Sequence, residues 1–311
     1  MTPAAGPDDA LAHLRAARTS DGAPSARNLI VTVFGDALLP HGAETEVSVR
    51  ALARLLDGFG VNERLVRTSL TRLVNDELLA VRAEGRRSYY RVAPAALDLF
   101  RRADERIYRG EVPDWDGAWT VVVIDGSEAT ADRRARLRHE LAWVGMGAVA
   151  PNVMASPVVS ASTAAATVQR VGGFEHVLVL RSEVVESAGT LGIDELARRC
   201  LAIDDVADRY RSFVDRFGPY RRASLEGLAP ADAFKLRVLA VAAFRRLVLG
   251  EPSIPIGLRP VGWVGDEARS VVADVYRRVA DAAEDFLLAT LEPSRPGAEP
   301  TDLAARFRSV R

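Results

Sequence analysis

A glycine-rich turn between two short helical segments, Asp57-Gly58-Phe59-Gly60, most restricts how this chain can fold. Before the turn, a helix is predicted to begin near the cap residue Ser48 and to bury one apolar side. After it, Asn62 can cap a helix over residues 62–75. The predicted inner stripe of this helix is Leu65, Val66, Ser69, Leu70 and Leu73. Two short helices joined by so few residues predict a helix-turn-helix.

The flanking segments complete a small domain. Apolar residues recur at helical spacing from Ser25 until Pro40 ends the helix. Two β-prone stretches, 78–82 and 86–92, flank a short connection that ends in glycine, which predicts a hairpin. A basic hairpin after a helix-turn-helix is typical of a wing. We therefore predict a winged helix-turn-helix domain over residues 25–110.

The outward side of the predicted helix at 62–75 carries side chains that donate hydrogen bonds. Arginine can hold guanine bidentately, asparagine can read adenine, and threonine can bond a phosphate or touch a thymine methyl. This side therefore suits the major groove of duplex DNA, with the hairpin arginines and tyrosines beside it. The predicted DNA-binding residues are Asn62, Arg64, Arg67, Thr68, Thr71, Arg72, Asn75, Arg86, Arg87, Ser88, Tyr89 and Tyr90.

Positive charge is concentrated in the same region. From Asn62 to Arg91 there are seven arginines and four acidic residues, in a chain with a formal net charge of −1. The whole chain has no excess of positive charge, whereas this segment does. This distribution favours binding to a particular site on nucleic acid through one basic surface over nonspecific binding along any nucleic acid. The alternative is a solvated helix face, because Lys235 is the only lysine among the 41 basic residues and arginine is common everywhere.

The remaining chain divides into a tail and two further domains. Residues 1–24, rich in Ala, Pro, Gly and Asp, predict a mobile tail. After a linker at 111–114, the predicted elements are a strand at 119–124, a helix at 130–144, a strand at 148–155, a helix at 161–170 and a strand at 174–180. This alternation predicts a ferredoxin-like α+β domain over 111–190. Only helical periods follow, which predicts a helical domain over 191–311. The fold class expected is multidomain α+β.

Several classes of protein are excluded by composition. Cys200 is the only cysteine, which excludes a disulfide framework, and the four histidines have no neighbour at metal-ligand spacing. No metal, cofactor or catalytic residue is predicted. No apolar run approaches the roughly 20 residues that span a bilayer, and the first residues do not resemble a secretory signal. We expect a cytoplasmic protein without a membrane partner.

Three segments resemble the PaaX-like family of bacterial repressors. The matching residues are Arg27-Asn28-Leu29-Ile30-Val31-Thr32-Val33-Phe34-Gly35-Asp36, Glu63-Arg64-Leu65-Val66-Arg67-Thr68-Ser69-Leu70-Thr71-Arg72-Leu73-Val74 and Gly85-Arg86-Arg87-Ser88-Tyr89-Tyr90-Arg91. Weaker likeness continues at 147–157 and from 234 to 260. The resemblance implies a winged-helix N-terminus, a middle domain like that of a CRISPR-associated ferredoxin-fold nuclease, and a helical C-terminal domain.

The resemblance also implies partners. They are a palindromic double-stranded DNA operator, a second copy of the chain in a homodimer, and an aryl-acetyl coenzyme A thioester that releases the repressor. Arg134 and Arg138 could meet the phosphates of coenzyme A, and Trp143 and Trp263 could line an apolar pocket. The alternative is that these arginines form a solvated helix face and that these tryptophans belong to the core.

Two other functions are compatible with the sequence. Asp125, at the end of the predicted strand 119–124, could hold magnesium together with its mate in a dimer, as in a metal-dependent nuclease. An aspartate before Gly126 is also a common turn residue. The winged helix could instead bind protein. Binding to a duplex taken from upstream of its own gene would separate these classes.

Overall fold

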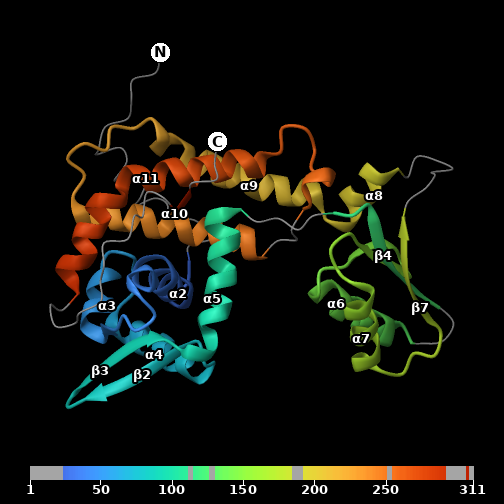
Figure 1. The fold of residues 1–311 in the computed structure, drawn as a ribbon, viewed down its shortest axis with the longest axis horizontal. Coiled ribbons are helices and arrows are strands. Elements are labelled where there is room, and N and C mark those ends of the chain that lie inside the picture. Colours follow the sequence, from blue (N-terminus) through green and yellow to red (C-terminus); the bar gives the residue numbers. More distant parts are fainter. Residues whose placement is uncertain are drawn as a thin grey trace. The chain divides into compact units, whose positions relative to one another are not determined.

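The computed structural model describes residues 24–110, 115–125, 130–183, 192–250, 254–291 and 306–307. The chain divides into two compact units of mixed helix and sheet (Figure 1). Unit 1 comprises residues 1–110, 210–250 and 265–311, and unit 2 comprises 111–209 and 251–264. Residues 1–23 of the predicted tail and the linker at 111–114 lie outside the described residues. None of the described helices is long and apolar enough to cross a membrane.

The first helix of unit 1 changes its winding along its length. Helix α2 (Ala26–Thr32) begins at Ser25, whose Oγ accepts from Asn28 N at 3.2 Å. It continues as a π-helical segment, η1 (Val33–Leu38), and a 3₁₀ turn, η2 (Leu39–His41). Proline within η2 and a positive φ at the following glycine end the helix. π-Helical segments are uncommon and often lie at functional positions.

The next two helices have the predicted caps. Ser48 Oγ accepts from Ala51 N at the start of α3 (Val49–Leu55), and Asn62 Oδ1 accepts from Leu65 N at the start of α4 (Glu63–Asn75). The buried stripe of α4 is Val66, Leu70 and Leu73. The prediction that Leu65 belongs to this stripe is wrong, since its side chain is 46% exposed. It is offset from Val66 by one residue, about 100° of helical rotation.

The hairpin follows α4 directly. Strands β2 (Leu79–Glu84) and β3 (Arg87–Val92) pair antiparallel, and β1 (Val47–Ser48) extends the sheet in the order β1-β3-β2. Gly85 has a φ of +59°, which favours glycine in this two-residue turn. Arg86, predicted to begin the second strand, lies in the turn instead. Three helical segments then follow: η3 (Pro94–Ala96), α5 (Leu97–Asp104) and the π-helical η4 (Glu105–Arg109).

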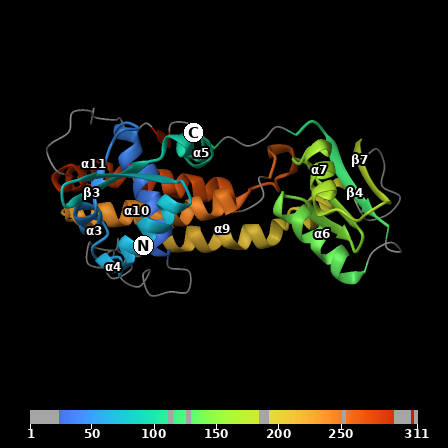
Figure 2. The same ribbon diagram turned by 90° about the horizontal axis from the view of Figure 1, so that it is seen from below.

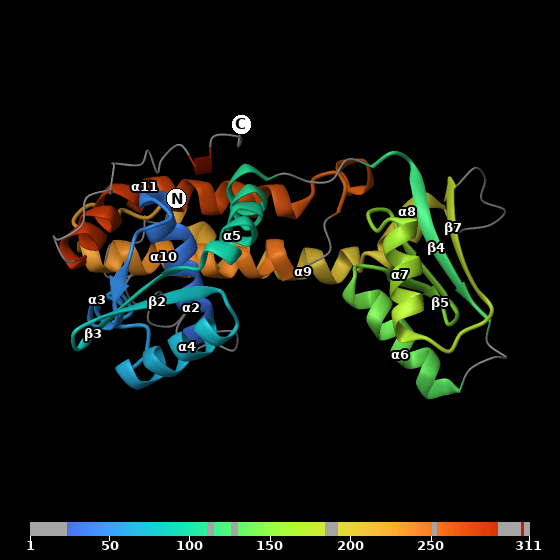
Figure 3. The same cartoon turned by 60° about the horizontal axis from the view of Figure 1, so that its bottom comes forward.

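Helices from the C-terminal part of the chain complete unit 1. They are the second half of α9 (Ile203–Phe217), η5 (Gly218–Arg221), α10 (Pro230–Gly250) and α11 (Val264–Thr290). Helix α2 lies between α10 and α4 (Figure 3). One apolar core includes residues of all these elements, among them Phe34, Leu70, Phe244 and Val272. The helix that carries the predicted DNA-reading residues therefore shares its core with helices far away in sequence.

Unit 2 contains a four-stranded antiparallel sheet in the order β5-β6-β4-β7. Its elements are β4 (Ala118–Ile124), α6 (Ala131–Trp143), β5 (Gly147–Ala150), β6 (Val153–Ser156), α7 (Ala161–Val171) and β7 (Val177–Glu183). Val122 and Ile124 of β4 share a core with Leu137, Leu141 and Ala164 of the two helices. Helices α6 and α7 thus pack side by side against the sheet (Figure 2).

The prediction of a single strand over residues 148–155, in unit 2, is wrong. The structure has two antiparallel strands there, β5 and β6, joined by a turn at Pro151 and Asn152. Proline cannot donate to a strand ladder, and asparagine favours turns, so the pair interrupts the predicted strand. Helix α8 (Ile193–Cys200) packs on β5, and a Cβ on Gly147 would lie 1.8 Å from the carbonyl oxygen of Cys200. A short 3₁₀ turn, η6 (Ile256–Leu258), is also in this unit.

Candidate nucleic-acid interface

The outward side of α4 is open to solvent. Arg64, Arg67, Thr68, Thr71 and Arg72 are all exposed, as is Asn75 at the end of the helix. The buried residues Val66, Leu70 and Leu73 lie on the opposite side. The amphipathic pattern therefore leaves the opposite face of α4 exposed to solvent, as the sequence predicts.

Two kinds of internal contact occupy part of this face. Arg67 Nη2 donates to Glu63 Oε1 at 2.5 Å, and both side chains are more than half exposed. Thr68 Oγ1 donates to Arg64 O at 2.9 Å, and Thr71 Oγ1 donates to Arg67 O at 3.1 Å. Since the hydroxyl hydrogens are used within the helix, the threonines present their methyl groups and oxygen lone pairs outward. Thymine-methyl contact suits them better than donation to phosphate.

Two of the hairpin arginines, Arg82 and Arg91, pair with glutamates. Arg82 donates to both oxygens of Glu46, from Nε to Oε1 at 3.2 Å and from Nη2 to Oε2 at 3.0 Å, and it also pairs with Glu84 at 2.8 Å. Its guanidinium lies 5.1 Å from the ring centroid of Tyr89, the residue opposite it in the sheet. Arg91 pairs with Glu44 at 3.0 Å. Glu44 and Glu46 precede β1, outside the segment 62–91 in which the sequence shows its arginine excess.

The predicted DNA-binding residues therefore differ in their exposure and in the contacts that they already make within the protein. The cations Arg64, Arg72 and Arg86 are exposed and have no side-chain partner among the described residues. Asn62 holds the helix N-terminus through its Oδ1, and Tyr90 is half-buried against the core of unit 1. Arg87 and Tyr89 have contacts of their own, and Ser88 is half-buried.

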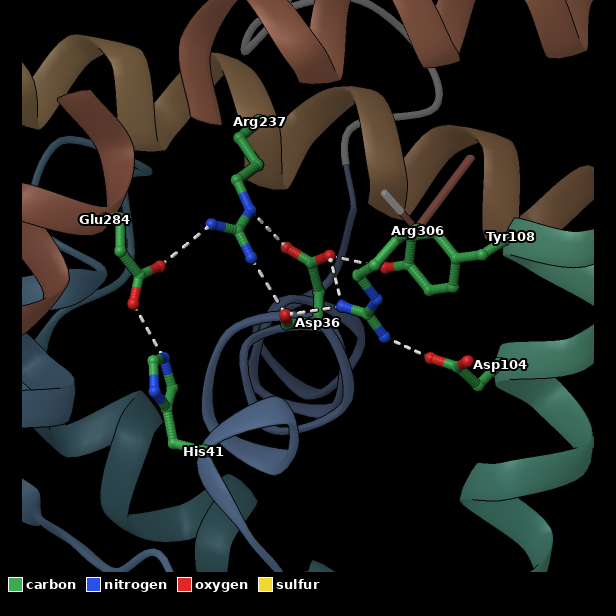
Figure 4. Close-up of polar contacts among 7 residues, drawn as sticks. All are labelled: Asp36, His41, Asp104, Tyr108, Arg237, Glu284 and Arg306. Carbon is green, nitrogen blue, oxygen red and sulfur yellow. Dashed lines mark hydrogen bonds and ion pairs between the residues drawn. The ribbon is translucent and has the colours of Figure 1, made fainter. Parts of the chain in front are cut away.

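Unit 1 also contains a buried polar cluster, which the sequence did not predict (Figure 4). At its centre Asp36, in η1, is 2% exposed. Arg237 Nε lies 2.8 Å from Asp36 Oδ2, and its Nη2 donates to Asp36 O at 2.9 Å. Arg306 Nη1 donates to the same carbonyl at 2.8 Å, and Tyr108 OH donates to Asp36 Oδ1. We call this set the Asp36 cluster; its residues are Asp36, His41, Asp104, Tyr108, Arg237, Glu284 and Arg306.

The outer members of the Asp36 cluster connect further elements. Arg306 also pairs with Asp104 of α5, and Arg237 Nη1 lies 3.3 Å from Glu284 Oε2 of α11. His41 Nε2 lies 2.7 Å from Glu284 Oε1, although not in hydrogen-bond geometry. The cluster thus ties η1 to α5, α10 and α11 by charged contacts.

Electrostatics keeps both arginines of the cluster charged. Burial alone would lower the pKa of Arg237, but Asp36 and the nearby tyrosines raise it above its ordinary value. The pKa of Arg306 is raised in the same way against its burial. Burial raises the pKa of Tyr108 well above its ordinary range, so its hydroxyl stays protonated and donates to Asp36. A buried ion network of this kind is costly to break from one side.

One signal for this cluster was present in the sequence. Asp36 interrupts the apolar run Val33, Phe34, Ala37 and Leu38, and Arg237 similarly stands in an apolar helix. A charged residue on a buried helix face requires a partner. Nothing in the local pattern identifies Arg306 as that partner, because it is 270 residues away from Asp36.

The predicted effector residues and Asp125 lie in unit 2. Arg134, Arg138 and Trp143 are on α6, and Trp263 precedes α11. Trp143 is 83% exposed, which excludes the alternative that it belongs to the core. Asp125 is exposed directly after β4. Within the described part of the chain, no group of three or more potential metal-ligating side chains occurs.

Comparisons with known proteins cover most of the chain. Three family models match: "PaaX-like protein" over residues 25–96, "PaaX protein central Cas2-like domain" over 112–192, and "PaaX-like protein C-terminal domain" over 202–289. The transcriptional repressor PaaX of Escherichia coli K12 is 33% identical over 266 residues, which cover 85% of this chain and 83% of that protein. A solved structure, the uncharacterized protein Rv0674 from Mycobacterium tuberculosis, has a TM-score of 0.54 at 20% identity. It covers 84% of this chain and 98% of its own, a likeness of fold alone.

Proposed function

The chain belongs to the PaaX-like family, and from this premise we propose that it represses transcription by binding double-stranded DNA through residues 25–110. The observation that carries the proposal is the exposed, hydrogen-bonding face of α4. The similar Escherichia coli protein bears the name of a transcriptional repressor. A regulator rather than an enzyme is the function that follows, and the nuclease alternative is not favoured.

The proposed domain is a winged helix-turn-helix, with α3 and α4 as the helix pair and the β2–β3 hairpin as the wing. In this arrangement Arg64, Arg67, Arg72 and Asn75 approach base edges and phosphates, and the turn residue Arg86 reaches the backbone beside them. DNA phosphates would most directly neutralise Arg64, Arg72 and Arg86, which have no side-chain partner in the part of the chain that the structure describes. Glu63 competes with DNA for Arg67.

The middle segment 111–190 is proposed to be ferredoxin-like, and the remainder 191–311 to be a helical domain. The βαββαβ order and antiparallel pairing of β4 to β7 support the first assignment. A homodimer is also proposed. Leu178 and Leu180 of β7 are 61% and 45% exposed, and two neighbouring apolar side chains of this kind favour a partner surface. Sedimentation of the full chain and of Leu178→Glu measures this directly.

DNA binding is tested with the full chain. Duplexes selected from a random pool should share a motif, and log affinity for the selected duplex should fall linearly with log salt. Arg67→Ala should weaken this binding by about 1–3 kcal/mol if Arg67 reads a base. Equal affinity and equal base preference in the variant would remove Arg67 from the reading face.

Arg101→Ala is the matched control. Arg101 of α5 pairs with Glu105 at the same i,i+4 spacing as Glu63 with Arg67 and has the same 62% side-chain exposure. Its loss should leave DNA affinity unchanged. If no duplex is selected while the winged helix captures a protein, the protein-binding alternative would replace the proposal.

Release of DNA by a small molecule is the remaining part of the proposal. Family resemblance points to an acyl coenzyme A thioester with an aromatic group, and Arg134, Arg138, Trp143 and Trp263 are its proposed contacts. Thioesters titrated into the complex with the selected duplex measure release.

A further inference from the structure

A cavity of about 340 Å³ lies within unit 1, apart from the exposed face of α4. Its size is at the lower end of small-molecule pockets. Most of its lining is apolar, contributed by α2, the turn after α4, α5, η4 and α10. These apolar residues include Val31, Leu78, Phe100, Ile107, Val241 and Leu249.

Among the charged residues that line the cavity, one arginine has no carboxylate partner in the described part of the chain. Asp36 and Asp104 are paired with arginines of the Asp36 cluster, and Arg27 pairs with Asp76 at 2.7 Å. Arg245 of α10 has no carboxylate partner among the described residues. The cavity therefore carries a local positive charge at Arg245.

Arg245 is held in an apolar setting by one neutral group. Its Nη2 donates to Asn28 Oδ1, and its buried Nε has no hydrogen-bond partner among the described residues. Burial lowers the pKa of Arg245, which shows that its charge is poorly solvated. A carboxylate that entered the cavity would gain a charge-assisted hydrogen bond and would compensate this cation. The amide nitrogen of Asn28 is left to donate as well.

The walls of the cavity connect with the DNA-reading helix. Leu78 follows the end of α4 after Glu77, whose φ of +58° is strained for a residue other than glycine. Arg27 bonds Asp76, the C-cap residue of α4. An occupant of the cavity would therefore touch the residues that fix where α4 ends and the hairpin begins.

We propose that this cavity binds a compact carboxylic acid with an apolar body, which Arg245 and Asn28 hold by its carboxylate. Its occupation changes the affinity of α4 for DNA, a regulatory consequence that rests on the proposed function. The site is distinct from the predicted effector residues of unit 2. It takes the free acid rather than a coenzyme A thioester, since a thioester has no carboxylate to place beside Arg245.

Calorimetry on the full chain without DNA tests the site. The probes are benzoate, cyclohexanecarboxylate, 3-phenylpropanoate and octanoate, each with its neutral amide and its coenzyme A thioester. At least one acid should bind saturably, and its amide and thioester should bind about tenfold more weakly or worse, because neither has a carboxylate attached to the apolar body. Binding of none of the acids, or equal binding of acid and amide, would overturn the proposal.

Variants locate the binding in the cavity. Arg245→Gln removes the cation, and Ala103→Leu fills space between α5 and the other walls without changing charge. Both should lose acid binding about tenfold or more, whereas Arg246→Gln, on the exposed side of the same helix, should retain it. Thermal melting identifies folded variants. Undiminished acid binding in either folded cavity variant would place the acid elsewhere and overturn the proposal.

A second measurement separates this inference from the proposed function. The bound acid should change affinity for the selected duplex about fivefold or more. Acid binding that depends on Arg245 in a protein that selects no duplex would support the site and overturn the proposed function. Duplex binding without acid binding would support the proposed function and overturn the acid site.

Discussion

The arginines on α4 and the arginines of the Asp36 cluster differ in what surrounds them. Arg67 has a side chain that is 62% exposed, and it pairs with one glutamate whose side chain is 57% exposed. Arg237 is fully buried, contacts two carboxylates and lies 4.8 Å from the ring centroid of Tyr276. The residue type is the same in both places. In a chain whose basic residues are nearly all arginine, only the partners and the burial of each guanidinium indicate its role.

This difference has an energetic meaning. An exposed ion pair contributes about 0–1 kcal/mol, so α4 would lose little stability if its arginines turned toward DNA as proposed. A buried pair costs about 3–5 kcal/mol when one partner is removed, because the other charge is left in an apolar interior. We therefore expect changes on α4 to alter DNA affinity alone and changes in the Asp36 cluster to alter folding.

The largest effect is expected from Asp36→Asn. Arg237 and Arg306 would lose the buried carboxylate that they share, and the unfolding free energy should fall by about 3–5 kcal/mol. Urea denaturation followed by circular dichroism measures the change. Asp98→Asn is the control, since this aspartate is exposed and pairs only at 3.5 Å with Arg101. Wild-type stability in Asp36→Asn would contradict the role assigned to the cluster.

Next in size is the effect of Arg72→Ala on DNA binding. Arg72 is exposed and without a side-chain partner among the described residues, so its removal should leave the urea midpoint in place. Affinity for the selected duplex should fall by about 1–3 kcal/mol if the guanidinium contacts a base. Fluorescence anisotropy with a labelled duplex gives the number. A loss of stability comparable to that of Asp36→Asn would remove the contrast between the two regions.

A smaller effect is expected at the hairpin turn. Arg86→Ala should weaken binding to all duplexes alike and reduce the slope of log affinity against log salt by about one, as for a single phosphate contact. Titrations at several salt concentrations on selected and unrelated duplexes measure this. A preference for particular bases that changes in the variant would instead assign Arg86 to base reading.

The smallest change is expected from Glu44→Gln. Glu44 is 83% exposed and neutralises Arg91 at 3.0 Å. Its loss should change stability by less than about 1 kcal/mol and should strengthen DNA binding slightly at low salt, since Arg91 becomes available. The same anisotropy assay detects the difference. Weaker binding would mean that Glu44 orients Arg91 rather than masking it.

Features that depend on neighbouring residues could be predicted from the sequence. The caps Ser48 and Asn62, the apolar stripe of α4 and the hairpin after it were predicted, because each is set by residues within a few positions. The predictions were wrong by one position at Leu65 and at Arg86, and they merged β5 with β6 across Pro151. Boundaries of this kind depend on packing as much as on local preference.

The sequence could predict which side chains of α4 are exposed at the candidate interface. It could not predict which arginines of the hairpin are neutralised by a carboxylate. Glu44 and Glu46 neutralise Arg91 and Arg82 from the segment just before β1, which lies outside the basic segment in sequence. The pairing of β1 with β3 brings this segment to the hairpin, and the register of that pairing is set by the buried face of the strands.

By itself, the sequence determined an amphipathic helix behind a glycine turn and a basic hairpin after it, because helix periodicity, capping and turn chemistry act over a few residues. Only the tertiary structure decided which arginines are compensated. Asp36 meets residues 108, 237 and 306, and Arg245 meets Asn28 beside a cavity. Contacts over such separations arise when a shared core packs, and the surrounding dielectric then fixes what each charge can do.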